Sequence, residues 1–214
     1  MPGKLPSEQG VDVAGVVAEV GPGVASFQVG DEMLGFCALN ARASQAEFAV
    51  VPTDHLTAKP PVVSWDVAGA LFTAGATAYA AVRAVGLAAG EVVAIAAATG
   101  GVGTIAVQLA KRAGATVLGI AGPAGDDWLT SHGAIPVNYG AHLADRLKAA
   151  VPGGRVDALL DFFGNGYVEL ALKELGVQPA RVNTTIDLAA LTAFPIQAHG
   201  NLHAAQASVV AELA

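Results

Sequence analysis

A glycine-rich turn between a short apolar run and an apolar helical segment constrains the fold of this chain most strongly. The turn reads Thr99-Gly100-Gly101-Val102-Gly103 and follows the run Glu91–Ala97. Its first two glycines let a ligand approach the backbone closely, and Gly103 lets the next helix pack against the strand. That helix, predicted over Val102–Ala113, would direct its free N–H groups and its positive end toward the turn. A strand, a glycine turn and a helix in this order predict a site for the pyrophosphate of a dinucleotide.

Further short apolar runs follow the turn, separated by helical spacers. Runs this short and this apolar are typical of a parallel sheet that helices cover on both faces. Repeated β-α-β units with right-handed crossovers predict an α/β fold with a Rossmann-type, doubly wound parallel sheet. The predicted strands are Glu91–Ala97, Thr116–Ala121, Ile135–Asn138, Val156–Leu160 and Arg181–Thr185. The predicted helices are Val102–Ala113, Gly125–His132, Ala141–Ala150, Gly166–Leu175 and, at the end, Leu202–Ala214.

The sequence before Pro60-Pro61 has a different pattern, which predicts mainly β-strands. Strands are predicted over Val11–Val20, Met33–Phe36 and Ala46–Val51, with glycine turns between the first two. After the prolines, Ser64 is a plausible N-cap for a helix over Trp65–Val85. We therefore predict two domains, residues 1–60 and 61–214.

Composition excludes several classes of protein. The net charge of -7 argues against a nucleic-acid partner, because phosphate binding needs a basic surface. No stretch has the length and apolarity of a membrane span, and the N-terminus lacks the apolar core of a signal peptide. Cys37 is the single cysteine, which excludes an internal disulfide and a cysteine-cluster metal site. These features predict a cytoplasmic protein.

The residues after the second predicted strand bear on the choice of cofactor. In NAD-specific proteins an acidic residue about 20 residues after the turn binds the ribose hydroxyls. That count reaches Ala121-Gly122, where there is no acid, which disfavours NAD and also disfavours a methyltransferase with a similar turn. No arginine follows, and Asp126 and Asp127 would repel a phosphate that they faced. NADP(H) is therefore preferred, NAD stays open, and a turn without a ligand is the remaining alternative.

Four segments resemble the zinc-independent medium-chain dehydrogenases/reductases of the quinone oxidoreductase and enoyl reductase type. The segments are Gly10–Val17 with Val20–Glu32, Thr73–Tyr79, Ala98–Lys111 (ATGGVGTIAVQLAK), and Asp157–Asp161 with Gly164. The resemblance implies a GroES-like β domain, here partial, that precedes the Rossmann-type domain. It also implies hydride transfer from NADP(H) to a small substrate, a quinone or an α,β-unsaturated carbonyl. Relative to the family pattern, the chain lacks segments at both ends.

Because of those missing segments, two other interpretations stay open: a dinucleotide-binding module without turnover or a fragment of a larger reductase, and an enoyl reductase unit of a polyketide-type system. The family further implies a homodimer formed through the sheet edge near Arg181–Thr185.

The resemblance also assigns candidate cofactor-binding residues. Thr77 would lie near the nicotinamide, and Tyr139 would lie beside the adenosine half. The candidates are Thr77, Thr99, Gly100, Gly101, Val102, Gly103, Gly122, Tyr139 and Phe163.

No catalytic acid or base and no metal site can be assigned from the sequence. Zinc-dependent relatives place a His-Glu pair where Gly10-Val11-Asp12 stands and a cysteine where Thr73 stands, so no zinc is expected. By its position Asp12 could be a functional carboxylate, but we expect it instead to fix a turn or to pair with a buried backbone group.

Overall fold

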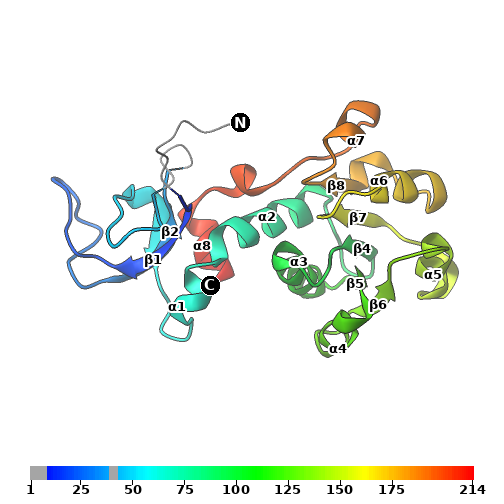
Figure 1. The fold of residues 1–214 in the computed structure, drawn as a ribbon, viewed down its shortest axis with the longest axis horizontal. Helices are drawn as coiled ribbons and strands as arrows, with labels where there is room; N and C mark the ends of the chain where they lie inside the picture. The colour runs from blue at the N-terminus through cyan, green and yellow to red at the C-terminus, as the bar shows by residue number, and fades with distance from the viewer. Residues whose placement is uncertain (1–8, 39–42) are drawn as a thin grey trace. The chain divides into compact units, whose positions relative to one another are not determined.

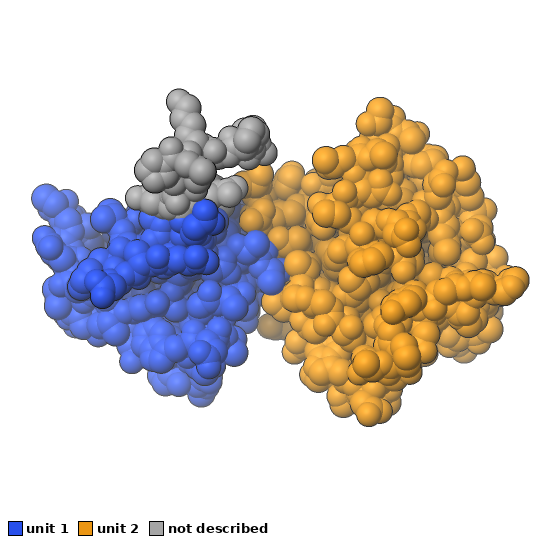
Figure 2. All heavy atoms as spheres, viewed as in Figure 1, with its two compact units in different colours: residues 1–76, 204–214 blue, residues 77–203 orange. Residues whose placement is uncertain are grey.

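The computed structural model describes residues 9–38 and 43–214. The chain divides into two compact units, coloured separately in Figure 2: Met1–Ala76 with Ala204–Ala214, and Thr77–His203. The domain boundary predicted at residue 60 rests on the change there from a β-rich pattern to alternating strand-like and helical segments, and it stays a prediction.

The described part of the first unit is built on a three-stranded antiparallel sheet of order β1-β2-β3. Its core includes the stacked rings of Phe36 and Phe72, whose centroids are 3.9 Å apart. The strands are β1 (Asp12–Val16), β2 (Glu32–Phe36) and β3 (Leu56–Ala58), with the 3-10 turn η1 (Thr53–His55) before β3. The helices are α1 (Trp65–Ala68), the first part of α2 (Leu71–Ala84) and α8 (Ala207–Leu213).

Several predicted elements of this unit were wrong or too long. Residues 46–51 form no strand: Phe48 and Val50 are largely exposed, so burial does not drive the segment into a sheet. The short strand β3 was not predicted, because three residues are too few to show the alternation of apolar and polar side chains that indicates a strand. The predicted strand over Val11–Val20 ends at Val16.

Both long helices predicted at the ends of this unit are interrupted. The one over Trp65–Val85 breaks at Gly69, which forms the C-cap of α1. The predicted Leu202–Ala214 helix divides into the 3-10 turn η6 (Asn201–Ala204) and α8.

Asp12 has the structural role that the sequence favours. Its carboxylate accepts hydrogen bonds from the backbone N–H of Thr73, at 2.9 Å, and from the Thr73 hydroxyl. These bonds tie β1 to α2 across 61 residues of sequence. A carboxylate and a threonine therefore pair where zinc-dependent relatives are expected to place metal ligands.

The second unit contains a five-stranded parallel sheet, counted over the described residues, with the order β6-β5-β4-β7-β8 (Figure 1). The chain starts in the middle, adds two strands on one side and then returns to add two on the other, which is the strand order of a Rossmann fold. Beyond β8, Gln197 forms a single parallel bridge to Asn183. The strands are β4 (Val92–Ala96), β5 (Thr116–Ala121), β6 (Ile135–Asn138), β7 (Ala158–Asp161) and β8 (Val182–Thr184).

Helices cover both faces of this sheet, so the predicted fold class is confirmed. Successive residues of β4 belong to different core clusters: Val93 and Ile95 pack with α2, α3 and α4, whereas Ala94 and Ala96 pack with α5, α6 and α7. This alternation is the period of two of a strand buried on both faces. The helices of the unit are α3 (Gly101–Arg112), α4 (Asp126–Ser131), α5 (Leu143–Ala149), α6 (Tyr167–Glu169) and α7 (Leu188–Ala193).

The predicted helix Gly166–Leu175 is not uniform. It begins as α6 and continues as the π-helical segment η4 (Leu170–Glu174), in which the N–H of Leu175 donates to the carbonyl of Leu170. The remaining single-turn 3-10 segments are η2 (Pro123–Gly125), η3 (Pro152–Gly154) and η5 (Pro179–Arg181).

Candidate functional site

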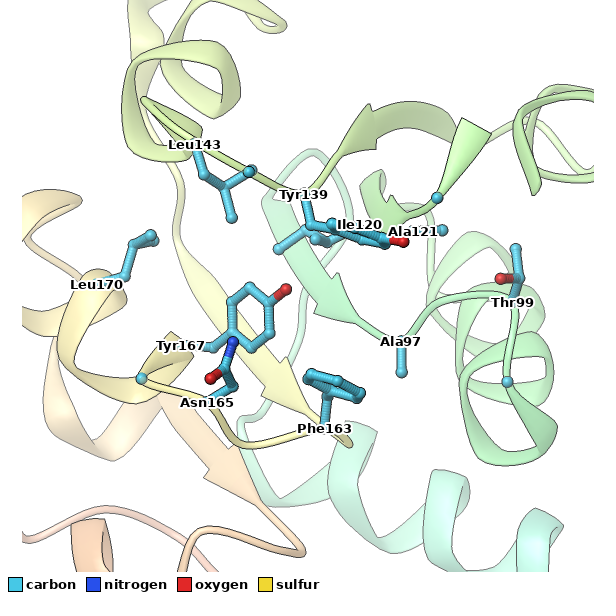
Figure 3. Close-up of a pocket in the computed structure, with 14 residues that line it drawn as sticks. Ala97, Thr99, Ile120, Ala121, Tyr139, Leu143, Phe163, Asn165, Tyr167 and Leu170 are labelled. Carbon is cyan, nitrogen blue, oxygen red and sulfur yellow. The ribbon is translucent and has the colours of Figure 1, made fainter. Parts of the chain in front are cut away.

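A cavity of about 780 Å³ lies at the carboxyl ends of the parallel strands (Figure 3). Residues at or just beyond the ends of β4, β5, β6 and β7 all contribute to its wall. The order of the sheet reverses between β4 and β7, and ligands of open α/β sheets bind at such a switch point. The lining residues are Ala97, Thr99, Gly100, Ile120, Ala121, Gly122, Tyr139, Gly140, Leu143, Phe163, Asn165, Gly166, Tyr167 and Leu170.

The glycine turn forms one wall of the cavity and starts α3. Ala97 has a positive φ of 54°, and its carbonyl accepts a hydrogen bond from the N–H of Gly100 at 2.9 Å, which closes the turn. Gly100 is the N-cap of α3 and has no side chain to cap the helix. The first N–H groups of an α-helix have no partner within the helix, so they are available to an anion at this end.

Gly103 is required for the packing that the sequence predicts. A Cβ atom at this position would lie 2.0 Å from the carbonyl oxygen of Ala97 and 2.8 Å from the Cα of Ala98. Both obstacles are backbone atoms of the turn. At Gly101, by contrast, a Cβ would meet nothing within 4 Å. The third glycine of the turn therefore serves packing, whereas the space at Gly101 is open.

Three aromatic residues from different elements line the opposite parts of the cavity. Tyr139 follows β6, and its hydroxyl lies 3.2 Å from the position of a Cβ on Gly122, so the ring covers that glycine. Phe163 follows β7 and meets Tyr167 of α6 edge-on, with ring centroids 6.2 Å apart (Figure 3). Aromatic faces of this kind can stack on the planar rings of a nucleotide.

The cavity brings together five of the nine predicted cofactor-binding residues: Thr99, Gly100, Gly122, Tyr139 and Phe163. Gly101, Val102 and Gly103 are the first residues of α3, and the side chain of Val102 packs against the core. Thr77 is buried in α2 and does not line the cavity. The roles of all nine in cofactor binding stay predictions.

In the loop after β7, Phe163 was predicted from the sequence, but the lining residues that follow it were not. Asn165, Gly166 and Tyr167 line the cavity, and Asn165 adopts a positive φ of 60° between two glycines that also have positive φ. The sequence Phe163-Gly164-Asn165-Gly166 at the end of a predicted strand was the available signal, because this is where ligands of α/β sheets bind.

Asp161, the last residue of β7, is completely buried beneath that loop. Its Oδ1 accepts hydrogen bonds from the N–H groups of Phe163, at 3.0 Å, and Gly164, at 2.8 Å. Its Oδ2 accepts one from the hydroxyl of Thr184 at 2.9 Å. Burial raises the pKa of Asp161 above its ordinary value of 3.8, although these three hydrogen bonds oppose the shift.

The raised pKa of Asp161 predicts a pH dependence of stability. Between the ordinary and the raised pKa the native state holds a proton that the unfolded state has lost, so the free energy of unfolding falls as the pH rises through this window. We expect the free energy of unfolding of D161N, minus that of the wild type, to rise from about pH 4 upward and then level off. Urea denaturation of both proteins at several pH values measures the difference. A constant difference, or one that falls with pH, would contradict the prediction.

No lining residue of the cavity carries a formal charge. Asp126 lies beyond the end of β5, where the carboxylate was expected to repel a phosphate, but its Oδ1 accepts a hydrogen bond from the Asn138 side chain at 2.8 Å. At the end of β6, the Arg146 guanidinium of α5 donates to the carbonyl oxygen of Asn138 at 2.6 Å. The structure therefore places an arginine beside the residue whose side chain binds Asp126.

His, Cys, Asp and Glu side chains within residues 9–38 and 43–214 form no group of three that could hold a metal ion. Over the same ranges, no helix has the length and apolarity needed to cross a membrane.

The comparisons with known proteins agree with this architecture. Residues 1–61 match the alcohol dehydrogenase GroES-like domain family. The chain is 33% identical over 178 residues to a quinone oxidoreductase of Rattus norvegicus, covering 80% of this chain and 53% of the relative. It is 35% identical over 171 residues to the polyketide synthase GfsB of Streptomyces halstedii, covering 79% of this chain and 3% of the synthase.

A solved structure shares the fold over the whole chain. The Escherichia coli quinone oxidoreductase complexed with NADPH superposes with a TM-score of 0.80 at 25% identity, covering 100% of this chain and 70% of that one. The chain is thus similar in sequence and in fold to medium-chain dehydrogenases/reductases of the quinone oxidoreductase and enoyl reductase type, as the resemblance predicted. The chain spans about half the length of the rat quinone oxidoreductase.

Proposed function

We propose that this chain binds NADP(H) and acts as an oxidoreductase, transferring hydride from the cofactor to a quinone or an α,β-unsaturated carbonyl. One observation carries the proposal: the glycine turn, with the N-terminus of α3 behind it, forms a wall of a cavity at the switch point of a Rossmann sheet. The likeness to quinone oxidoreductases and to a polyketide synthase supports the reaction class.

The residues around the cavity fit a dinucleotide. The N–H groups of Gly101, Val102 and Gly103 would hold the pyrophosphate, because the positive end of α3 favours an anion there. Tyr139 and Phe163 would flank the rest of the cofactor through their rings. Thr77 would lie near the nicotinamide, as the family resemblance implies.

NADP(H) is preferred over NAD(H) because no carboxylate lines the cavity at Gly122, where one would bind the ribose hydroxyls. The hydrogen bond from Asn138 partly satisfies the carboxylate of Asp126, which reduces the objection to a phosphate nearby. The likeness to a quinone oxidoreductase solved with NADPH points in the same direction.

The bound nicotinamide would supply the hydride, so the chain's own residues bind and orient it. We propose that the reaction needs no zinc, because Asp12 bonds to Thr73 where zinc-dependent relatives are expected to place ligands. A cytoplasmic location and a homodimer stay predictions from the sequence.

The chain also matches a short stretch, 3% of the length, of a polyketide synthase. This match favours one alternative, in which the chain is an enoyl reductase unit within a larger enzyme. The two functions differ in the acceptor and share the cofactor site.

The test is a titration of the purified chain with NADPH and NADH, followed by absorbance at the nicotinamide band after adding a quinone or an enoyl thioester. Tighter binding of NADPH than of NADH, with oxidation in the presence of either acceptor, is the expected result. Binding without oxidation would contradict turnover by this chain and leave a dinucleotide-binding module. Binding of neither cofactor would overturn the proposal.

A further inference from the structure

Two buried polar residues, Asp161 and Thr184, connect the loops that follow β7 and β8. They are paired directly across the two parallel strands and are both completely buried. The Thr184 hydroxyl donates to Asp161 Oδ2 at 2.9 Å. Buried polar groups are costly unless hydrogen-bonded, and both of these are fully engaged.

Asp161 holds the loop that lines the cavity. Its Oδ1 accepts from the N–H groups of Phe163 and Gly164, and the next residues, Asn165 and Gly166, turn the chain with positive φ angles of 60° and 83°. Phe163 is 59% exposed, so packing does little to fix its position. The two hydrogen bonds to one carboxylate oxygen therefore restrain the backbone of Phe163 and Gly164 at this wall of the cavity.

Thr184 holds the neighbouring loop with the same hydroxyl. Its Oγ1 accepts from the N–H groups of Ile186, at 3.3 Å, and Asp187, at 3.0 Å. The two loops also lie close together, since a Cβ added at Gly164 would lie 3.5 Å from Cγ2 of Ile186. One buried pair of side chains thus fixes two adjacent turns at the carboxyl edge of the sheet.

We propose that Asp161 and Thr184 form a positioning pair for the cofactor: Asp161 fixes the Phe163–Tyr167 wall of the cavity, and Thr184 keeps the carboxylate oriented toward that wall. The inference rests on the proposed function for the identity of the ligand. Neither Asp161 nor Thr184 is among the residues that line the cavity. Their effect on the cofactor therefore passes through the backbone of the loop. Asparagine can replace the carboxylate only in part, because it offers an acceptor at one of its two terminal atoms.

The test compares NADPH affinity with stability in the purified chain. D161A is expected to raise the Kd for NADPH about tenfold, because it removes the one oxygen that accepts from both loop N–H groups. D161N and T184V are expected to have intermediate effects, and T184S, which keeps the hydroxyl, should bind like the wild type. L147A is the control: Leu147 is completely buried in α5 and does not line the cavity. It should lower the melting temperature without changing the Kd of the folded protein.

A second readout does not depend on the ligand. A tryptophan introduced as F163W, in a background where the two native tryptophans are replaced (W65F and W128F), reports the mobility of the loop through its fluorescence anisotropy. The anisotropy should fall when D161A or D161N is added and stay unchanged with L147A. Wild type that binds no NADPH would overturn the proposed function, and the anisotropy would still decide the positioning role. Normal NADPH binding by D161A and T184V would overturn the positioning pair. It would also be overturned if L147A raised the Kd for NADPH as much as D161A does for the same loss of stability. If D161A does not fold, D161N and T184V decide the outcome.

Discussion

The variant G103A is expected to lose about 3 kcal/mol of unfolding free energy. The new Cβ would lie 2.0 Å from the carbonyl oxygen of Ala97 and 2.8 Å from the Cα of Ala98. These backbone atoms belong to the turn that directly follows β4, so they cannot move aside as a flexible side chain could. Intrinsic helix propensity predicts the opposite sign, since alanine is favoured over glycine within a helix by about 1 kcal/mol.

The matched control is G101A, the same change two residues earlier in α3. A Cβ at Gly101 meets nothing within 4 Å, so this variant should keep or slightly raise the stability. Urea denaturation of both variants measures the difference. Equal stabilities would show that the close packing of α3 against the turn is not what requires glycine at 103.

The variant G101D is expected to fold normally and to weaken NADPH binding by at least about 100-fold, or roughly 2.7 kcal/mol. Its side chain would enter the open space before the N-terminus of α3, where we propose that the pyrophosphate lies. An aspartate in the first turn of a helix interacts favourably with the helix dipole, so stability should be retained. The variant therefore separates binding from folding, and isothermal titration together with a melting curve measures both.

Q108E provides the control for charge. Gln108 is exposed on the same helix, so glutamate adds the same charge away from the cavity. Its NADPH affinity should match that of the wild type. Unchanged NADPH binding by folded G101D would contradict a pyrophosphate site at this turn.

Much of the second unit was predictable because its residues carry local signals. Short apolar runs buried on both faces gave β4, β5 and β6 to within a residue or two, and the glycine turn placed the start of α3. The first unit was predicted less well, because apolar alternation in residues 46–51 is not accompanied by burial, and β3 has only three residues. A π-helical segment such as η4 has no sequence period that distinguishes it from an α-helix.

The candidate site divides in the same way. Thr99, Gly100 and Gly122 stand at the ends of predicted strands, so the topology rule was enough to suggest them. The roles of Asp161 and Thr184 were not readable, because they are 23 residues apart and their bond exists only once β7 and β8 are paired. An isolated aspartate at a strand end looks the same whether it faces solvent or lies buried.

By itself, the sequence determined the fold class and the position of the glycine turn, because strand period, helix starts and glycine spacing are properties of neighbouring residues. Only the tertiary structure decided that Gly103 serves packing while the space at Gly101 is open, because that depends on how closely α3 approaches the end of β4. It also decided which buried carboxylate holds the wall of the cavity, since hydrogen bonds between β7, β8 and their loops form only when distant segments meet.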